Sequence, residues 1–159
     1  MARILAIDPG NEKSAYVLYN MLTKLPEEFG IEDNEDLLAR IGHIQADDMA
    51  IEMVASYGMA VGKTVFDTCV YIGRFVERWI IHNSVPPYYI YRKDVKMCLC
   101  GSMRAKDANI RQAIIDRYPA IGGGKIPQIG TKKRPGLLHG VSKDIWSALA
   151  VAITYEETR

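Results

Sequence analysis

The sequence has few cysteines and no long apolar run. Its three cysteines, Cys69, Cys98 and Cys100, have neither the spacing of a zinc site nor the pattern of a disulfide framework, so we expect small buried thiols in a reducing compartment. No apolar run approaches the roughly 20 residues of a membrane span. A strand pattern begins within three residues of the start, which leaves no room for a signal peptide. These features predict a cytoplasmic protein without membrane contact.

The sequence also lacks a complete nucleotide-binding loop. Residues 58–64 (GMAVGKT) follow a strand pattern and open a helix pattern, as a phosphate-binding loop does. The loop is one residue short, because Tyr57 stands where the first glycine is required. We therefore expect no nucleotide cofactor. The three histidines share no ligand spacing either.

Composition predicts one globular domain over residues 1–159, because the chain is 48% hydrophobic and 25% charged and shows no linker or internal repeat. Its net charge of +1 hides an asymmetry. Residues 1–80 carry 13 Asp and Glu against 7 Lys and Arg, whereas residues 81–159 carry 6 against 13. A basic half is typical of polyanion-binding proteins, although an ordinary solvated surface would look the same.

The order of patterns predicts an α/β fold with a mixed central sheet flanked by helices. Apolar patterns of strand type lie at residues 4–8, 14–20, 47–53 and 88–92. Apolar residues at helical spacing lie at residues 35–45, 60–82, 93–100 and 106–118, and in a last helix that Ser142 is expected to cap. Residues 22–36 and 120–141 are predicted loops, and the second is long enough to be functional or disordered.

Three acidic residues end or begin elements that could meet. Asp8 follows a strand that is apolar on both faces, and Glu52 lies near the end of the strand at 47–53. Asp144 falls in the first turn of the last helix. Three converging carboxylates would suit Mg²⁺ or Mn²⁺. The alternatives are a turn-capping role for Asp8, since Asp-Pro-Gly is ordinary turn chemistry, and helix-dipole compensation for Asp144.

Basic and aromatic residues supply candidate DNA contacts. Several basic residues flank expected helix starts, where backbone N–H groups also favour phosphate. The basic set is Arg92, Lys93, Lys96, Arg104, Lys106, Arg111, Lys132, Lys133, Arg134 and Lys143. Tyr57 and Met59 could stack on bases or wedge between them, or they could pack under the following helix.

Four stretches resemble one family. Residues 4–10 (ILAIDPG) closely resemble the opening strand of RuvC-type Holliday-junction resolvases, which belong to the RNase H-like superfamily. Residues 50–52 (AIE) resemble the second family acid, and residues 105–112 (AKDANIRQ) resemble the family's lysine-bearing turn and helix. Residues 142–154 (SKDIWSALAVAIT) resemble its closing acidic helix. Residues 55–59 and 71–75 are similar to shorter RuvC-like proteins of bacteriophages, which would place the chain in a host cell's cytoplasm.

The resemblance implies an RNase H-like fold, a homodimer, dependence on Mg²⁺ with Mn²⁺ as a substitute, and paired nicking of four-way DNA junctions. It implies that Asp8, Glu52 and Asp144 are catalytic metal ligands, and that Lys106 is a catalytic basic residue near the scissile phosphate. One position departs from the family. The last helix of the cellular enzymes usually carries two acids, or a His and then an acid, spaced three residues apart, where this chain has Asp144 and Ser147.

The leading hypothesis is therefore a Mg²⁺-dependent, structure-selective DNA endonuclease that cleaves Holliday junctions and other branched DNA by two-metal hydrolysis. A homodimer through the exposed side of residues 60–82 would relate two active sites by a two-fold axis. The alternative is a non-catalytic protein that binds branched DNA on the same fold, which the serine at position 147 permits. A third class is an RNA-processing nuclease.

Overall fold

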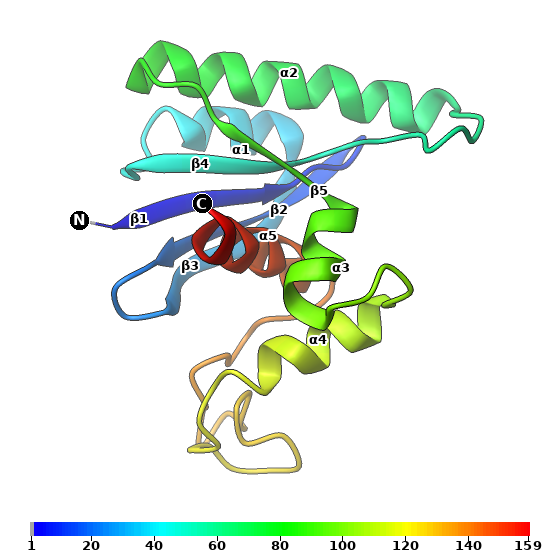
Figure 1. Ribbon diagram of the computed structural model, residues 1–159. Coiled ribbons are helices and arrows are strands. Elements are labelled where there is room, and N and C mark those ends of the chain that lie inside the picture. The colour runs from blue at the N-terminus through cyan, green and yellow to red at the C-terminus, as the bar shows by residue number, and fades with distance from the viewer. Residues whose placement is uncertain (1) are drawn as a thin grey trace.

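A five-stranded mixed sheet forms the centre of the computed structural model, which describes residues 2–159 (Figure 1). The strand order is β3-β2-β1-β4-β5. The central strand β1 pairs antiparallel with β2 and parallel with β4, while β3 and β5 form the edges. The strands are β1 (Arg3–Asp8), β2 (Lys13–Asn20), β3 (Leu25–Asp33), β4 (Asp48–Met53) and β5 (Tyr88–Tyr91). The predicted mixed sheet is confirmed.

Five helices flank the sheet, and none of those between residues 2 and 159 is long and apolar enough to cross a membrane. Helices α1 and α2 cover one face, whereas α5 packs on the other with α3 and α4 against it (Figure 1). The helices are α1 (Asn34–Ile41), α2 (Lys63–Asn83), α3 (Arg92–Cys100), α4 (Asp107–Ile115) and α5 (Ile145–Thr158). The two faces follow from the period of β1, because Leu5 and Ile7 face α1 and α2 while Ile4 and Ala6 face α5.

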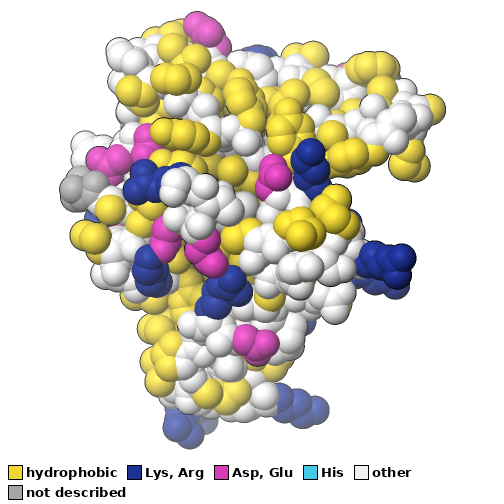
Figure 2. Space-filling model, in the orientation of Figure 1, with side chains coloured by type: hydrophobic (Ala, Val, Ile, Leu, Met, Phe, Trp, Pro, Cys, Tyr) yellow, Lys and Arg dark blue, Asp and Glu magenta, His cyan; other side chains and the backbone are white. Residues whose placement is uncertain are grey.

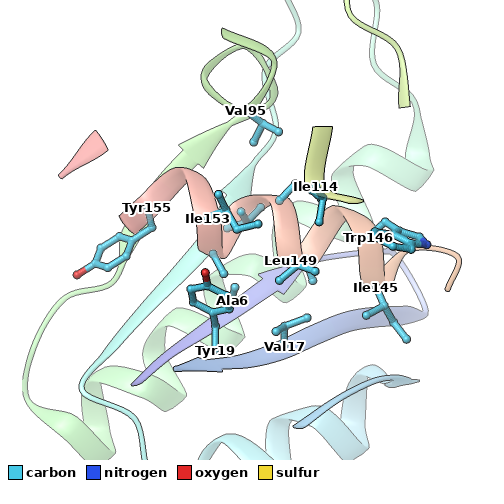
Figure 3. Packing of buried hydrophobic residues seen from close by; sticks show 14 of the residues in the cluster. Ala6, Val17, Tyr19, Val95, Ile114, Ile145, Trp146, Leu149, Ile153 and Tyr155 are labelled. Carbon is cyan, nitrogen blue, oxygen red and sulfur yellow. The ribbon is translucent and has the colours of Figure 1, made fainter. Parts of the chain in front are cut away.

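Helix α5 is buried on nearly all sides between the sheet and two other helices. Figure 3 shows Leu149 above Ala6 and Val17 of the sheet, while Val95 of α3 and Ile114 of α4 approach α5 from the opposite side. A helix that is apolar all round belongs in such an interior. This packing fixes the direction of α5 and therefore the place of its N-cap residue, Asp144.

Residues 22–36 were predicted to be a loop, and that prediction is wrong. They contain the whole of β3, which pairs antiparallel with β2 with a register irregularity at Leu18 and Tyr19 of β2. Glu27 and Glu28 are exposed and Pro26 lies near the strand's start. Charged residues and proline are common on edge strands, where they block pairing with other chains, so the polar composition marks a sheet edge.

Two helix starts also differ from prediction. The long helix begins at Lys63, with Gly62 as its N-cap, instead of at residue 60. The last helix has Asp144 as its N-cap, not Ser142. The reason is Lys143, whose positive φ of 49° interrupts helical backbone before Asp144. Asp144 therefore lies at the helix entry, ahead of its first turn.

Residues 120–141, hereafter the glycine loop, contain no strand or helix, as predicted, but they are densely hydrogen-bonded. Gly123 N–H donates to the carbonyl of Arg134, and Gly136 N–H donates to that of Ile129, each over 2.9 Å. A Cβ on Gly136 would come within 2.3 Å of the Pro127 and Gln128 carbonyl oxygens. The loop is thus a packed unit that depends on close backbone contacts at glycine.

Gly136→Ala should destabilise the protein by about 1–3 kcal/mol, because backbone atoms must move to admit the methyl group. Gly73→Ala is the matched control, since a Cβ on this exposed α2 glycine meets nothing within 4 Å. That change should stabilise by about 0.5–1 kcal/mol through helix propensity. Urea denaturation measures both, and limited proteolysis reports loop opening. Equal stability of the two variants would contradict the packing described.

Candidate active site

The register of two parallel strands brings Asp8 and Glu52 together. Ile7 of β1 pairs with Ile51 of β4, so the next residue of each strand, Asp8 and Glu52, lies beside the other at the carboxyl ends. Both point toward the α5 face, because they are in phase with Ala6 and Ala50. Carboxyl ends of parallel strands are where α/β folds commonly bind ligands.

Asp144 joins this pair from the N-terminal end of α5. Its side chain is exposed. Its charge contributes to raising the pKa of both Asp8 and Glu52. The three predicted acids therefore share one electrostatic neighbourhood, although they come from positions up to 136 residues apart.

Burial and mutual repulsion disfavour full ionisation of the site. Desolvation by burial, followed by the charges of Glu52 and Asp144, raises the pKa of Asp8 to about 8. Burial also raises the pKa of Glu52, against the opposing effect of the Arg92 charge. Close carboxylates with raised pKa values favour a bound cation, since it relieves their repulsion. Such perturbed groups are also frequent in functional sites.

The donor chemistry fits a hard divalent cation. Three carboxylates offer the oxygen ligands that Mg²⁺ and Mn²⁺ prefer. Glu52 Oε1 is buried without a hydrogen-bond partner, so a buried ligand atom is free for coordination. Over residues 2–159, however, no three His, Cys, Asp or Glu side chains are close enough to hold an ion. The acids would have to close on a metal by side-chain movement.

Two further charged residues complete the site. Arg92, the first residue of α3, makes an ion pair with Glu52 at 3.7 Å and hydrogen-bonds Asp107. The charge of Asp107, the first residue of α4, contributes to raising the pKa of both Asp8 and Glu52. The sequence placed Arg92 only within a broad basic set. Asp107 was not predicted, because an acid in a first helical turn looks like ordinary dipole compensation.

A pocket of about 450 Å³ opens beside these acids. Its lining includes Arg92, Asp107, Lys143, Asp144 and Ser147. The Arg111 guanidinium, which also lines it, lies 5.2 Å from the centroid of the Trp146 ring. Ser147 thus faces the pocket next to Asp144, where the resembling family usually has a second acid.

Most of the predicted basic contacts are exposed, whereas Arg92 and Lys96 are half-buried. Figure 2 shows Lys and Arg side chains around the lower part, over α4 and the glycine loop, and hydrophobic side chains over α2. Lys106 is the N-cap of α4, next to Asp107. The other exposed members of the predicted basic set are Lys93, Arg104, Arg111, Lys132, Lys133, Arg134 and Lys143.

Tyr57 and Met59 lie in the segment between β4 and α2. Their exposed fractions are 61% and 75%, so the alternative that they pack under the following helix is wrong. In Figure 2 this part of the chain projects at the upper right, above a notch that the α3 side bounds below. The segment follows directly from the strand that carries Glu52.

Two solved structures share this architecture. The structure of Thermus thermophilus RuvC matches with a TM-score of 0.63 and 15% sequence identity, over 96% of this chain and 92% of that one. T. thermophilus RuvC in complex with Holliday junction substrate matches with a TM-score of 0.60 and 15% identity, over 97% and 92%. No family model and no curated protein matches the chain. The likeness establishes a RuvC-like, RNase H-like fold, as predicted.

Proposed function

We propose that the protein is a Mg²⁺-dependent endodeoxyribonuclease that cleaves four-way DNA junctions and other branched DNA. One observation carries the proposal. Asp8 and Glu52 lie side by side at the carboxyl ends of β1 and β4 with raised pKa values, and the charge of Asp144 contributes to both shifts. The fold that places them there is shared with a protein solved in complex with a Holliday junction substrate.

The chain's residues divide the chemistry between them. Asp8, Glu52 and Asp144 would hold Mg²⁺, or Mn²⁺ in its place. Bound divalent cations activate water and stabilise the charge of a phosphodiester undergoing hydrolysis. Lys106, exposed at the start of α4, would stabilise the negative charge that develops on the scissile phosphate.

The surface around the acids is suited to branched DNA. Basic side chains on α4 and the glycine loop would follow the phosphate backbone. Tyr57 and Met59 are exposed on the segment that leaves the active-site strand. An apolar side chain there could enter the stack at a branch point, where bases are least well stacked. In this proposal the basic side chains provide affinity for DNA, and the segment with Tyr57 and Met59 provides selectivity for branched structures.

A homodimer would use the outer face of α2. Phe66, Val70 and Ile81 are 59%, 61% and 65% exposed and lie on one side of the helix, given its period of about 3.6 residues. Exposed apolar faces of this kind favour association, and a two-fold axis would relate two active sites to two opposed strands. The bacteriophage type of the resembling family stays a prediction.

A plasmid that extrudes a cruciform tests cleavage and pairing in one assay. With Mg²⁺ we expect linear product, because a dimer cuts both strands across the junction in one encounter. With a chelator, or with a relaxed plasmid lacking the cruciform, we expect no cleavage. Nicked circles alone would contradict paired cleavage, and an intact plasmid would contradict the nuclease proposal.

The alternative is a non-catalytic protein that binds branched DNA. Ser147 in place of an acid, together with the separation of the three acids in the described residues, favours it. Such a protein would shift a four-way junction in a gel, with strong salt dependence, yet leave the cruciform plasmid intact with Mg²⁺ or Mn²⁺.

A further inference from the structure

Arg92 lies between two acids of different exposure. Its Nη1 is 3.7 Å from Glu52 Oε1, and its Nη2 hydrogen-bonds Asp107 Oδ1. The Glu52 side chain is 21% exposed, whereas that of Asp107 is 88% exposed. One guanidinium therefore links a largely buried carboxylate with one that is almost fully in solvent.

The backbone fixes the place of Arg92 at this point. Arg92 follows β5 directly, and β5 is in register with β4, where Glu52 pairs with Ile90. The start of α3 is fastened by Tyr91 N–H, which donates to the Asp94 carboxylate at 3.1 Å. Residues at such anchored helix starts keep their direction, so the contact depends on side-chain rotamers alone.

Arg92 makes its closer contact with Asp107, the more exposed of the two acids. A guanidinium gains more from a buried carboxylate, because the local dielectric constant is lower there. Arg92 nevertheless hydrogen-bonds the exposed acid, and its 3.7 Å separation from Glu52 exceeds hydrogen-bond length. Glu52 Oε1 is buried and has no hydrogen-bond partner.

We propose that Asp107 is a positioning residue that holds Arg92 off Glu52, so that Arg92 offsets the charge of the site while Glu52 stays available to a metal. The inference rests on the proposed metal-dependent function. Without Asp107, Arg92 is free to form a bidentate bond with Glu52, the geometry that guanidinium and carboxylate favour. A divalent cation would then have to displace it. Asp107 raises metal affinity through Arg92, with no bond to the metal.

Titration of the purified protein with Mn²⁺ alone, followed by calorimetry, tests this proposal without DNA. We expect Asp107→Ala to weaken Mn²⁺ binding by about tenfold, because Mn²⁺ would then have to displace an ion pair between Arg92 and Glu52. Adding Arg92→Gln to Asp107→Ala should restore affinity to within about threefold of the parent, because the competing cation is gone. Asp36→Ala, an exposed first-turn acid on α1, is the matched control and should change nothing.

The outcomes separate this inference from the function on which it rests. No Mn²⁺ binding by the parent protein would overturn the metal site and the inference together. Binding by the parent with equal affinity in Asp107→Ala would overturn only the inference. Weak binding by both Asp107→Ala and the double variant would identify Asp107 as a metal ligand, and would also overturn its role as a positioning residue. Circular dichroism of each variant confirms that it is folded.

Discussion

Replacing Asp8 with Asn is expected to slow Mg²⁺-dependent cleavage of a four-way junction by about 10²–10⁴-fold, since a lost metal ligand costs several kcal/mol of transition-state stabilisation. Asp8 is the acid at the tip of the central strand, beside Glu52 and within the field of Asp144. Single-turnover rates on a labelled junction measure the effect. Asp33→Asn is a suitable control, because Asp33 also ends a strand but is exposed at the far edge of the sheet. An Asp8→Asn variant that cleaves at the parental rate would disprove the proposed mechanism.

The same substitution should stabilise the metal-free protein. Burial and neighbouring acids raise the pKa of Asp8 to about 8 in the folded state, against about 3.9 in an unfolded chain. The unfolded state therefore loses its proton first, and the parent loses stability as pH rises from about 4 to about 8. Asn carries no such charge. We expect Asp8→Asn to gain on the order of 1–3 kcal/mol at high pH, and little near pH 4.

Chemical denaturation in a chelator at the two ends of this range measures the gain. A gain that is independent of pH would show that ionisation of Asp8 is not its origin. Saturating Mg²⁺ should reverse the order by stabilising the parent selectively. Opposite changes in activity and metal-free stability are expected of a residue that serves function at a cost to folding.

Strands of the sheet could be predicted from sequence where the spacing of apolar residues indicates which side chains are buried. Strand β1 is apolar on both faces because it is central, and its end at Asp8 was predicted from that run. Strand β3 was missed because it borders only β2 and carries exposed acids. Amino-acid composition reflects how deeply a strand is buried. It therefore indicates central strands better than edge strands, which form through pairing with one adjacent strand.

The site was predictable to the same extent. Asp8 ends β1 and Glu52 lies one residue before the end of β4, so strand boundaries could predict that these two lie together, whereas a shared metal site with Asp144 stays a prediction. Asp107 gave no such signal, because its part depends on how α4 sits against α3 and on one rotamer of Arg92. The order within the glycine loop was equally hidden, since it arises from backbone contacts such as those of Gly136, which have no side-chain pattern.

Removing the three charges of Lys132, Lys133 and Arg134 together should weaken junction binding by about 10–10³-fold at moderate salt. All three side chains are exposed on the glycine loop, whose backbone bonds do not depend on them, with Arg134 contributing mainly its carbonyl. If each contacts a phosphate, the slope of log affinity against log salt should fall by about 2–3. Fluorescence anisotropy over a salt series measures both quantities.

The matched control removes three basic side chains at the opposite end of α5. Lys24 and Arg117 pair with Glu156 and Glu157 there, and Arg159 lies over Tyr155. Alanine at these three positions lowers net charge equally, so it should leave the salt slope nearly unchanged if DNA follows the start of α4 and the glycine loop. Equal slopes for both triple variants would mean that overall charge attracts DNA. A loss of affinity with an unchanged slope in the loop variant would instead indicate loop collapse, which proteolysis would detect. Only a change in slope confined to the loop variant would support the glycine loop as a rigid phosphate-binding surface.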